Sequence, residues 1–207
     1  MPRRRNTGIS TRKQPRQARS TELVSAILKA AIQVLEKEGA PRFTTARVAE
    51  KAGVSVGSVY QYFPNKASIL FRLQSEEWRQ TSDMLRTILA DTKHKPLDRL
   101  RAAVHAFVTS ECDEAVMRTA LDDAAPLYRD SPEAKAAKAD SPMLAFIAEV
   151  LPRAASKVRA TAAELIKTTM GHGGKAFSET PRTAAEITAY SDAMADMFCA
   201  YLRSLGA

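Results

Sequence analysis

Polar and aromatic side chains suited to nucleic-acid binding are concentrated between Thr44 and Lys66, in the stretch TTARVAEKAGVSVGSVYQYFPNK. The amide of Gln61 can pair with the edge of adenine in the major groove, and neighbouring hydroxyl groups can bind phosphates or bases. Gly57 lets the backbone approach a phosphate, and Lys66 stands where a helix N-terminus can hold another. These residue types predict DNA binding rather than catalysis.

Two short helices joined by a tight turn would position these side chains. Val48 and Ala49 form the inner face of the first helix, and Gly53 can adopt the positive φ that a tight turn requires. Val59 and Phe63, four residues apart, share one face of the second helix and should anchor it. This spacing predicts a helix-turn-helix; the alternative is an ordinary pair of antiparallel helices.

The motif AxxAGVSVGSVYQYFPNKASIL, which begins at Ala49, resembles the DNA-binding domain of the TetR family of bacterial transcriptional repressors. The resemblance covers roughly residues 20–70, and VYQYFPNK is its most specific part. It implies an all-α homodimer, with an N-terminal three-helix domain that binds DNA and a larger helical domain for ligand binding and dimerisation. The DNA contacts that it implies are Thr44, Thr45, Arg47, Ser55, Val56, Gly57, Tyr60, Gln61, Tyr62 and Lys66.

Basic residues are concentrated at the N-terminus. The chain has a formal net charge of +8, and residues 1–19 hold seven Lys or Arg and no acid, so residues 20–207 carry a net charge of only +1. Such an arm attracts phosphate, either by lying along a minor groove or by non-specific attraction alone. We predict a basic arm over residues 1–19, a helix-turn-helix domain over 20–66 and an effector-binding and dimerisation domain over 67–207.

Amphipathic stripes predict about nine helices in total, one of which runs without Gly or Pro from Asn65 to about Ala90. The glycine-rich segment GHGGKAFSETPR, residues 171–182, is predicted to be a loop. The resemblance places the dimer interface on the helices over about 154–170 and 183–205. The interface residues expected there are Val158, Leu165, Ile166, Ile187, Tyr190, Met194, Phe198 and Tyr201.

A pocket for a small organic effector would be mainly apolar and would lie between helices of the second domain. Its candidate lining residues have aromatic, thioether, thiol or aliphatic side chains near predicted helix faces, a pattern that ordinary core residues share. They are Trp78, Phe107, Cys112, Met117, Leu121, Tyr128 and Phe146. The resemblance favours a compound that binds the DNA-incompetent form and thereby relieves repression.

No catalytic, cofactor or metal site is predicted. The GGK sequence at Gly173 lacks the spacing of a phosphate-binding loop, and the three histidines are isolated from one another. The two cysteines form no CxxC pair, and no apolar run is long enough for a membrane span, so we expect a bacterial cytoplasmic protein at the nucleoid.

The expected partners are double-stranded DNA with a palindromic operator, a second copy of the chain and an unidentified organic effector. Two alternatives to this ligand-responsive repressor remain: a DNA-binding regulator without a small-molecule ligand, and an enzyme that contains a helix-turn-helix.

Overall fold

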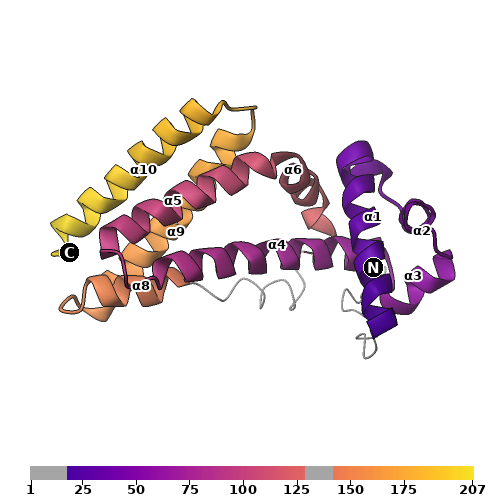
Figure 1. The fold of residues 1–207 in the computed structure, drawn as a ribbon, viewed down its shortest axis with the longest axis horizontal. Helices are drawn as coiled ribbons and strands as arrows, with labels where there is room; N and C mark the ends of the chain where they lie inside the picture. Colours follow the sequence, from indigo (N-terminus) through magenta and orange to yellow (C-terminus); the bar gives the residue numbers. More distant parts are fainter. Residues whose placement is uncertain (1–17, 129–141) are drawn as a thin grey trace, which may run out of the picture. The chain divides into compact units, whose positions relative to one another are not determined.

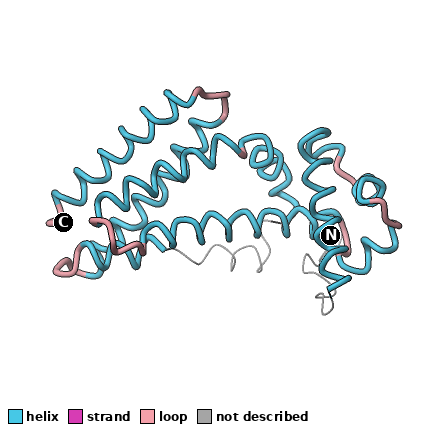
Figure 2. The backbone as a smooth tube through the Cα atoms, viewed as in Figure 1, coloured by secondary structure: helices cyan, strands magenta, loops and turns pink. Residues whose placement is uncertain are grey.

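The computed structural model describes residues 18–128 and 142–207, and its regular structure is helical throughout these ranges (Figures 1 and 2). The described residues contain nine α-helices, one 3-10 helix and no strand, which confirms the all-α prediction. The helices are α1 (Ala18–Arg42), α2 (Thr45–Ala52), α3 (Val56–Tyr62), α4 (Lys66–Leu89), α5 (Pro96–Asp113), α6 (Ala115–Ala124), η1 (Ala125–Leu127), α8 (Pro142–Val150), α9 (Ser156–Ser178) and α10 (Ala184–Ser204).

The chain divides into two compact units, each with its own hydrophobic core. Among the described residues, the first unit comprises 18–78 and 116–128, and the second comprises 79–115 and 142–207. The α4 helix therefore begins in the first unit and ends in the second. The functional boundary expected at residue 66 stays a prediction, and the basic arm over 1–19 lies almost wholly outside the described residues.

The core of the first unit is built from one face of each short helix. Val48 of α2, Val59 of α3 and Phe63 after α3 are fully buried, together with Ile27 of α1. Gly39 has a φ of +72°, so the regular helical geometry of α1 is interrupted there. These side chains hold α2 and α3 in the predicted helix-turn-helix arrangement.

A series of buried polar contacts joins α6 and η1 to α4 inside the first unit. The hydroxyl of Tyr128 lies 3.2 Å from the carbonyl oxygen of Leu121 and 3.4 Å from Oε1 of Gln74. The Gln74 amide donates to Glu77 at 2.8 Å, and the guanidinium of Arg118 binds the same carboxylate at 2.8 Å. Burial raises the pKa of Tyr128, so its hydroxyl stays protonated and continues to donate.

The core of the second unit lies between α5, α8, α9 and α10. Leu100, Ile147, Ile166 and Leu202, one from each of these helices, are fully buried. Arg99 at the start of α5 is also buried, and it donates to Glu149 at the end of α8. The long amphipathic stripes of the sequence thus form one packed core in this unit.

The glycine-rich segment is helical as far as Ser178, which corrects the prediction of a loop over residues 171–182. A Cβ atom at Gly174 would lie 2.8 Å from Cε1 of Phe107, and one at Gly173 would lie 3.0 Å from the hydroxyl oxygen of Tyr190. The glycines therefore allow α5 and α10 to approach α9 closely. The helix persists because this packing outweighs the low helix propensity of glycine.

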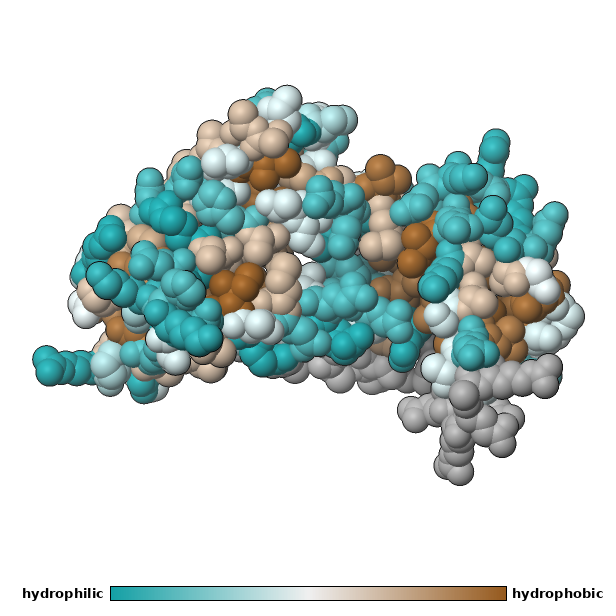
Figure 3. Space-filling view, viewed as in Figure 1, coloured by the Kyte–Doolittle hydropathy of each residue, from teal (hydrophilic) through white to brown (hydrophobic). Residues whose placement is uncertain are grey.

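Hydrophilic and apolar residues are interspersed on the face shown in Figure 3. None of the helices in the described ranges is both long and apolar enough to cross a membrane. The large apolar side chains that remain exposed are Val56, Tyr60, Val116, Leu127, Leu144, Val158, Leu165 and Met197.

Candidate nucleic-acid interface

The start of α2 is fixed by a side-chain cap. Thr44 is extended, and its hydroxyl oxygen accepts a hydrogen bond from the backbone N–H of Arg47 at 3.3 Å. Because the oxygen accepts that bond, the hydroxyl proton of this exposed residue remains able to donate to a phosphate.

The turn between α2 and α3 has the geometry that the sequence predicts. Gly53 adopts a φ of +68°, and its N–H bonds back to the carbonyl groups of Ala49 and Glu50. Ser55 then caps α3 by accepting from the N–H of Ser58 at 3.0 Å. The turn and both caps are local, so α3 is held in a fixed orientation on α2.

The side chains of α3 are divided between a buried face and an exposed face. Val59 is fully buried, whereas Val56 and Tyr60 are 39% and 43% exposed. Gly57 and Gln61 are exposed as well. The exposed face therefore presents methyl groups, a phenol and an amide.

Two expected DNA contacts are less accessible than the sequence analysis assumes. Thr45 and Tyr62 are only 8% and 5% exposed, and Tyr62 belongs to the core of the first unit. Tyr62 follows Val59 by three positions, a spacing that places both on one helix face and that is visible in the sequence. We therefore do not expect these two side chains to read bases.

Lys66 is the first residue of α4, and a reciprocal cap precedes it. The side-chain oxygen of Asn65 accepts from the N–H of Ser68 at 2.9 Å, and the Ser68 hydroxyl donates to the Asn65 carbonyl at 2.6 Å. Lys66 itself is half-buried. Its position next to a helix N-terminus suits a phosphate contact.

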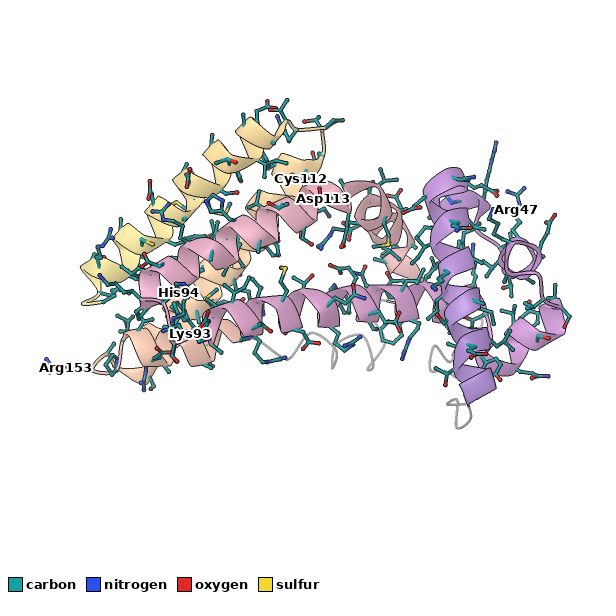
Figure 4. All side chains as sticks on the ribbon, viewed as in Figure 1. Arg47, Lys93, His94, Cys112, Asp113 and Arg153 are labelled. Atoms are coloured by element: carbon teal, nitrogen blue, oxygen red, sulfur yellow. The ribbon has the colours of Figure 1, made fainter. Side chains whose placement is uncertain are left out.

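Arg47 is already bound within the chain. Its guanidinium forms an ion pair with Glu38 near the end of α1, and Figure 4 shows Arg47 on α2 next to that helix. Both side chains are partly exposed, at 46% for Arg47 and 31% for Glu38. A carboxylate and a phosphate offer a guanidinium the same paired oxygen acceptors, so the ion pair with Glu38 would have to open before Arg47 could bind a phosphate in this way.

Replacing Glu38 by glutamine is expected to raise the affinity for any DNA duplex by about two- to fivefold, the range that a partly exposed ion pair allows. Titration of labelled duplexes at several salt concentrations measures the change. Glu36→Gln removes the same charge from an exposed position on the same helix and serves as the control. Equal gains from the two variants would mean that only general charge matters and that the ion pair does not compete.

Two separate parts of the chain match known protein families. Residues 27–73 match the family described as bacterial regulatory proteins, tetR family, and residues 95–205 match the tetracyclin repressor-like C-terminal domain. The second match alone covers more than half of the chain. The chain belongs to the TetR family.

Two relatives with curated descriptions match this chain over part of its length. The nucleoid occlusion factor SlmA of Vibrio campbellii is 36% identical over 92 residues, which are 44% of this chain and 46% of that protein. The transcriptional regulator BetI of Stenotrophomonas maltophilia is 31% identical over 96 residues, which are 46% and 49% of the two chains. The match thus spans about half the length of these relatives.

A solved structure extends the likeness to nearly the whole fold. The transcriptional regulator FadR from Bacillus subtilis, in complex with stearoyl-CoA, has a TM-score of 0.62 and is 16% identical. The alignment covers 84% of this chain and 96% of FadR. At that identity the likeness concerns the fold alone.

The expected pocket residues of this TetR-family chain fall into two separate cores. Leu121 and Tyr128 are buried in the core of the first unit, and Met117 packs against that core, whereas Phe107 and Phe146 are buried in the second. Trp78 and Cys112 are half-buried, and burial raises the pKa of the Cys112 thiol, which favours its neutral form. The seven candidates do not share one core, so the packing gives no support to a single pocket lined by all of them.

A surface depression of about 780 Å³ lies in the second unit and involves none of those candidates. It lies beside the segments that join α4 to α5 and α8 to α9, next to the C-terminal residues. Its polar lining includes Lys95, Glu149, Arg153 and Arg203. Within the described ranges, no group of three His, Cys, Asp or Glu side chains is arranged to hold a metal ion.

The residues expected at the dimer interface differ in exposure. Ile166, Met194 and Phe198 are buried in the core of their own unit, so they offer almost no surface to a partner. Ile187, Tyr190 and Tyr201 are half-buried. Val158 and Leu165 are exposed on α9, at 38% and 48%, and Met197, which is not among the expected interface residues, is 51% exposed on α10.

Proposed function

We propose that the chain is a transcriptional repressor that binds an operator through α3 and leaves it when a small organic effector binds. One observation carries the DNA-binding part of this proposal. The exposed face of α3 is formed by Val56, Gly57, Tyr60 and Gln61. The capped turn before α3 and the buried side chain of Val59 hold this face in place. Such a face suits the edges of base pairs in the major groove.

Action as a homodimer on a palindromic operator is the second part of the proposal. A single α3 contacts only one half-site, and a two-fold dimer doubles the readout at a fixed spacing. The exposed apolar side chains of Val158, Leu165 and Met197, on α9 and α10, support a partner surface on these helices. The buried residues Ile166, Met194 and Phe198 would act only indirectly, by holding the two helices in place.

Release by an effector is supported by the family and by the structural likeness to FadR, which was solved with stearoyl-CoA. The second candidate is a DNA binder without a small-molecule ligand, which the likeness to a protein named nucleoid occlusion factor favours. Screening organic compounds for a rise in melting temperature, and then for release of DNA, separates the two. A compound that stabilises the protein and releases DNA supports the repressor.

We further propose that the chain acts by binding rather than by catalysis, in the cytoplasm at the nucleoid. No Ser-His-Asp arrangement is recognisable in the sequence, and the ring nitrogens of His94 and His105 lie within hydrogen-bond distance of Asp91 and Asp192, at 3.1 and 3.0 Å. The family is described as bacterial regulatory proteins, and this supports the proposal that the chain acts at the nucleoid, where bacterial DNA lies.

Gln61→Ala is expected to weaken binding to DNA from the chain's own promoter region by about tenfold, because a base-reading amide is removed. Fluorescence anisotropy with that duplex and with a scrambled one measures the effect. Tyr60→Ala should weaken binding to both duplexes, and both variants should melt as wild type does because the two residues are exposed. If both variants bind as tightly as wild type, α3 is not the reading helix. Tyr62→Ala is unsuitable here, since the buried ring stabilises the fold.

Deleting residues 1–15 removes Arg3, Arg4, Arg5, Arg12 and Lys13, which lie outside the described residues. We expect weaker binding to every duplex and a flatter dependence of log affinity on log salt, by about 0.9 for each phosphate that the arm neutralises. An unchanged slope would show that the arm does not meet phosphate. Weakening confined to sites with a narrow minor groove would instead favour an arm that lies in that groove.

A further inference from the structure

The exposed face of α3 contains no charged side chain. The helix reads VGSVYQY, without Lys, Arg, Asp or Glu. Val56 and Tyr60 are four residues apart and both exposed, and Gly57 and Gln61 form the neighbouring exposed pair. Because i and i+4 positions share a helix face, these four residues form one continuous uncharged surface.

The serine hydroxyls at the start of α3 are engaged with the helix itself. The Ser55 oxygen accepts from the N–H of Ser58, and the two hydroxyl oxygens lie 2.8 Å apart in a hydrogen bond. One hydroxyl proton of this pair is not used in the bond and suits a phosphate. On the exposed face, the groups that can meet base edges are the Val56 methyls, the Tyr60 phenol and the Gln61 amide.

These groups match some bases and not others. Guanine is read best by the paired donors of Arg or by Lys, and cytosine by an acidic acceptor, and α3 has neither. Adenine offers an N7 acceptor and an N6 donor, which fit one glutamine amide. Thymine offers a C5-methyl group, which packs against an apolar side chain.

We infer that α3 reads A·T base pairs, with the Gln61 amide on an adenine and the Val56 methyls on a thymine C5-methyl. The inference rests on the proposed DNA-binding function and specifies its substrate class. Tyr60, between them on the exposed face, is left for a phosphate or a sugar. The base pairs that Val56 and Gln61 contact are therefore A·T. Other residues of the chain are free to contact G·C pairs elsewhere in the operator.

Selection from a random duplex library with the full chain provides the site. In the selected duplex, each thymine is replaced singly by deoxyuridine, which removes the C5-methyl and keeps the pairing. Each adenine is replaced singly by 7-deazaadenine, which removes N7. We expect at least one thymine and one adenine whose alteration weakens wild-type binding by about fivefold or more.

Two variants assign these effects to side chains. For Val56→Ala, removing the methyl of the sensitive thymine should no longer change the affinity, whereas removing N7 of the sensitive adenine should still weaken binding. For Gln61→Ala, removing N7 should no longer change the affinity, whereas removing the thymine methyl should still weaken binding. This double-mutant cycle isolates each contact from general effects on affinity. Val56→Thr, which keeps one methyl, should retain part of the thymine effect, and both Val56 variants should fold because the side chain is 39% exposed.

The failure of the inference differs from the failure of the proposed function. If no sequence is enriched over random duplexes, sequence-specific DNA binding is itself wrong. If a site is enriched but its Val56- and Gln61-dependent positions are G·C, the chain is a DNA reader and the A·T inference is overturned. Deoxyuridine substitutions without effect at every thymine would overturn the Val56 contact in the same way.

Discussion

Replacing Arg118 by methionine is expected to lower the free energy of unfolding by about 3 kcal/mol. Arg118 binds Glu77 at 2.8 Å, and their side chains are only 15% and 5% exposed. Methionine fills much of the space but removes the cation, so the buried carboxylate loses a charge that offsets its desolvation. Chemical denaturation measures the decrease, and hydrogen exchange should show that the amides of α6 lose protection first.

Two further variants test whether burial is the cause. Arg79→Met breaks an ion pair with Asp83 whose side chains are 66% and 48% exposed, and it should cost less than about 0.5 kcal/mol. The double variant Arg118→Met/Glu77→Gln removes both buried charges, keeps an acceptor for the Gln74 amide and should recover most of the stability that Arg118→Met loses. Equal decreases from Arg118→Met and Arg79→Met would contradict the argument from burial.

The helix-turn-helix was predictable because it depends on a few consecutive residues. The positive φ of Gly53 and the burial of Val59 and Phe63 follow from turn chemistry and from one helix face. Tyr62 lies on that same face, three positions after Val59, so its burial could be read from the spacing. The resemblance implies a DNA contact for Tyr62 all the same, and that contact stays a prediction.

The pocket and the interface were less predictable because they depend on which long helices meet. Ile166 and Phe198 have the apolar character of interface residues, but both face the core of their own unit. Leu121 and Phe146 belong to different cores, although both lie on apolar stripes of the sequence. A helical stripe specifies that a face is buried, and the partner that buries it is set by tertiary contacts far apart in the chain.

The glycines of α9 differ in how closely neighbouring side chains approach them. Glycine is a poor helix former, and three glycines among four residues favour a loop when only propensity is considered. Gly174 nevertheless lies where α9 meets α5, and an added Cβ atom there would be 2.8 Å from Phe107 and 3.2 Å from the Cγ atom of Glu111. At Gly171 an added Cβ would meet no atom within 4 Å.

Gly174→Leu is therefore expected to lower the free energy of unfolding by about 3 kcal/mol, because the side chain must displace Phe107 or separate the helices. Gly174→Ala should lower it by about 1 kcal/mol, since the steric cost exceeds the gain in helix propensity. Gly171→Ala has the same gain without the clash, and it should stabilise the chain by up to about 1 kcal/mol. Thermal and chemical denaturation of the three variants measure these differences. The two alanine variants lie three residues apart in one helix, so changes of opposite sign in their free energy of unfolding would separate the effect of close packing from that of helix propensity. An increase in stability at both positions would mean that Phe107 moves aside at little cost.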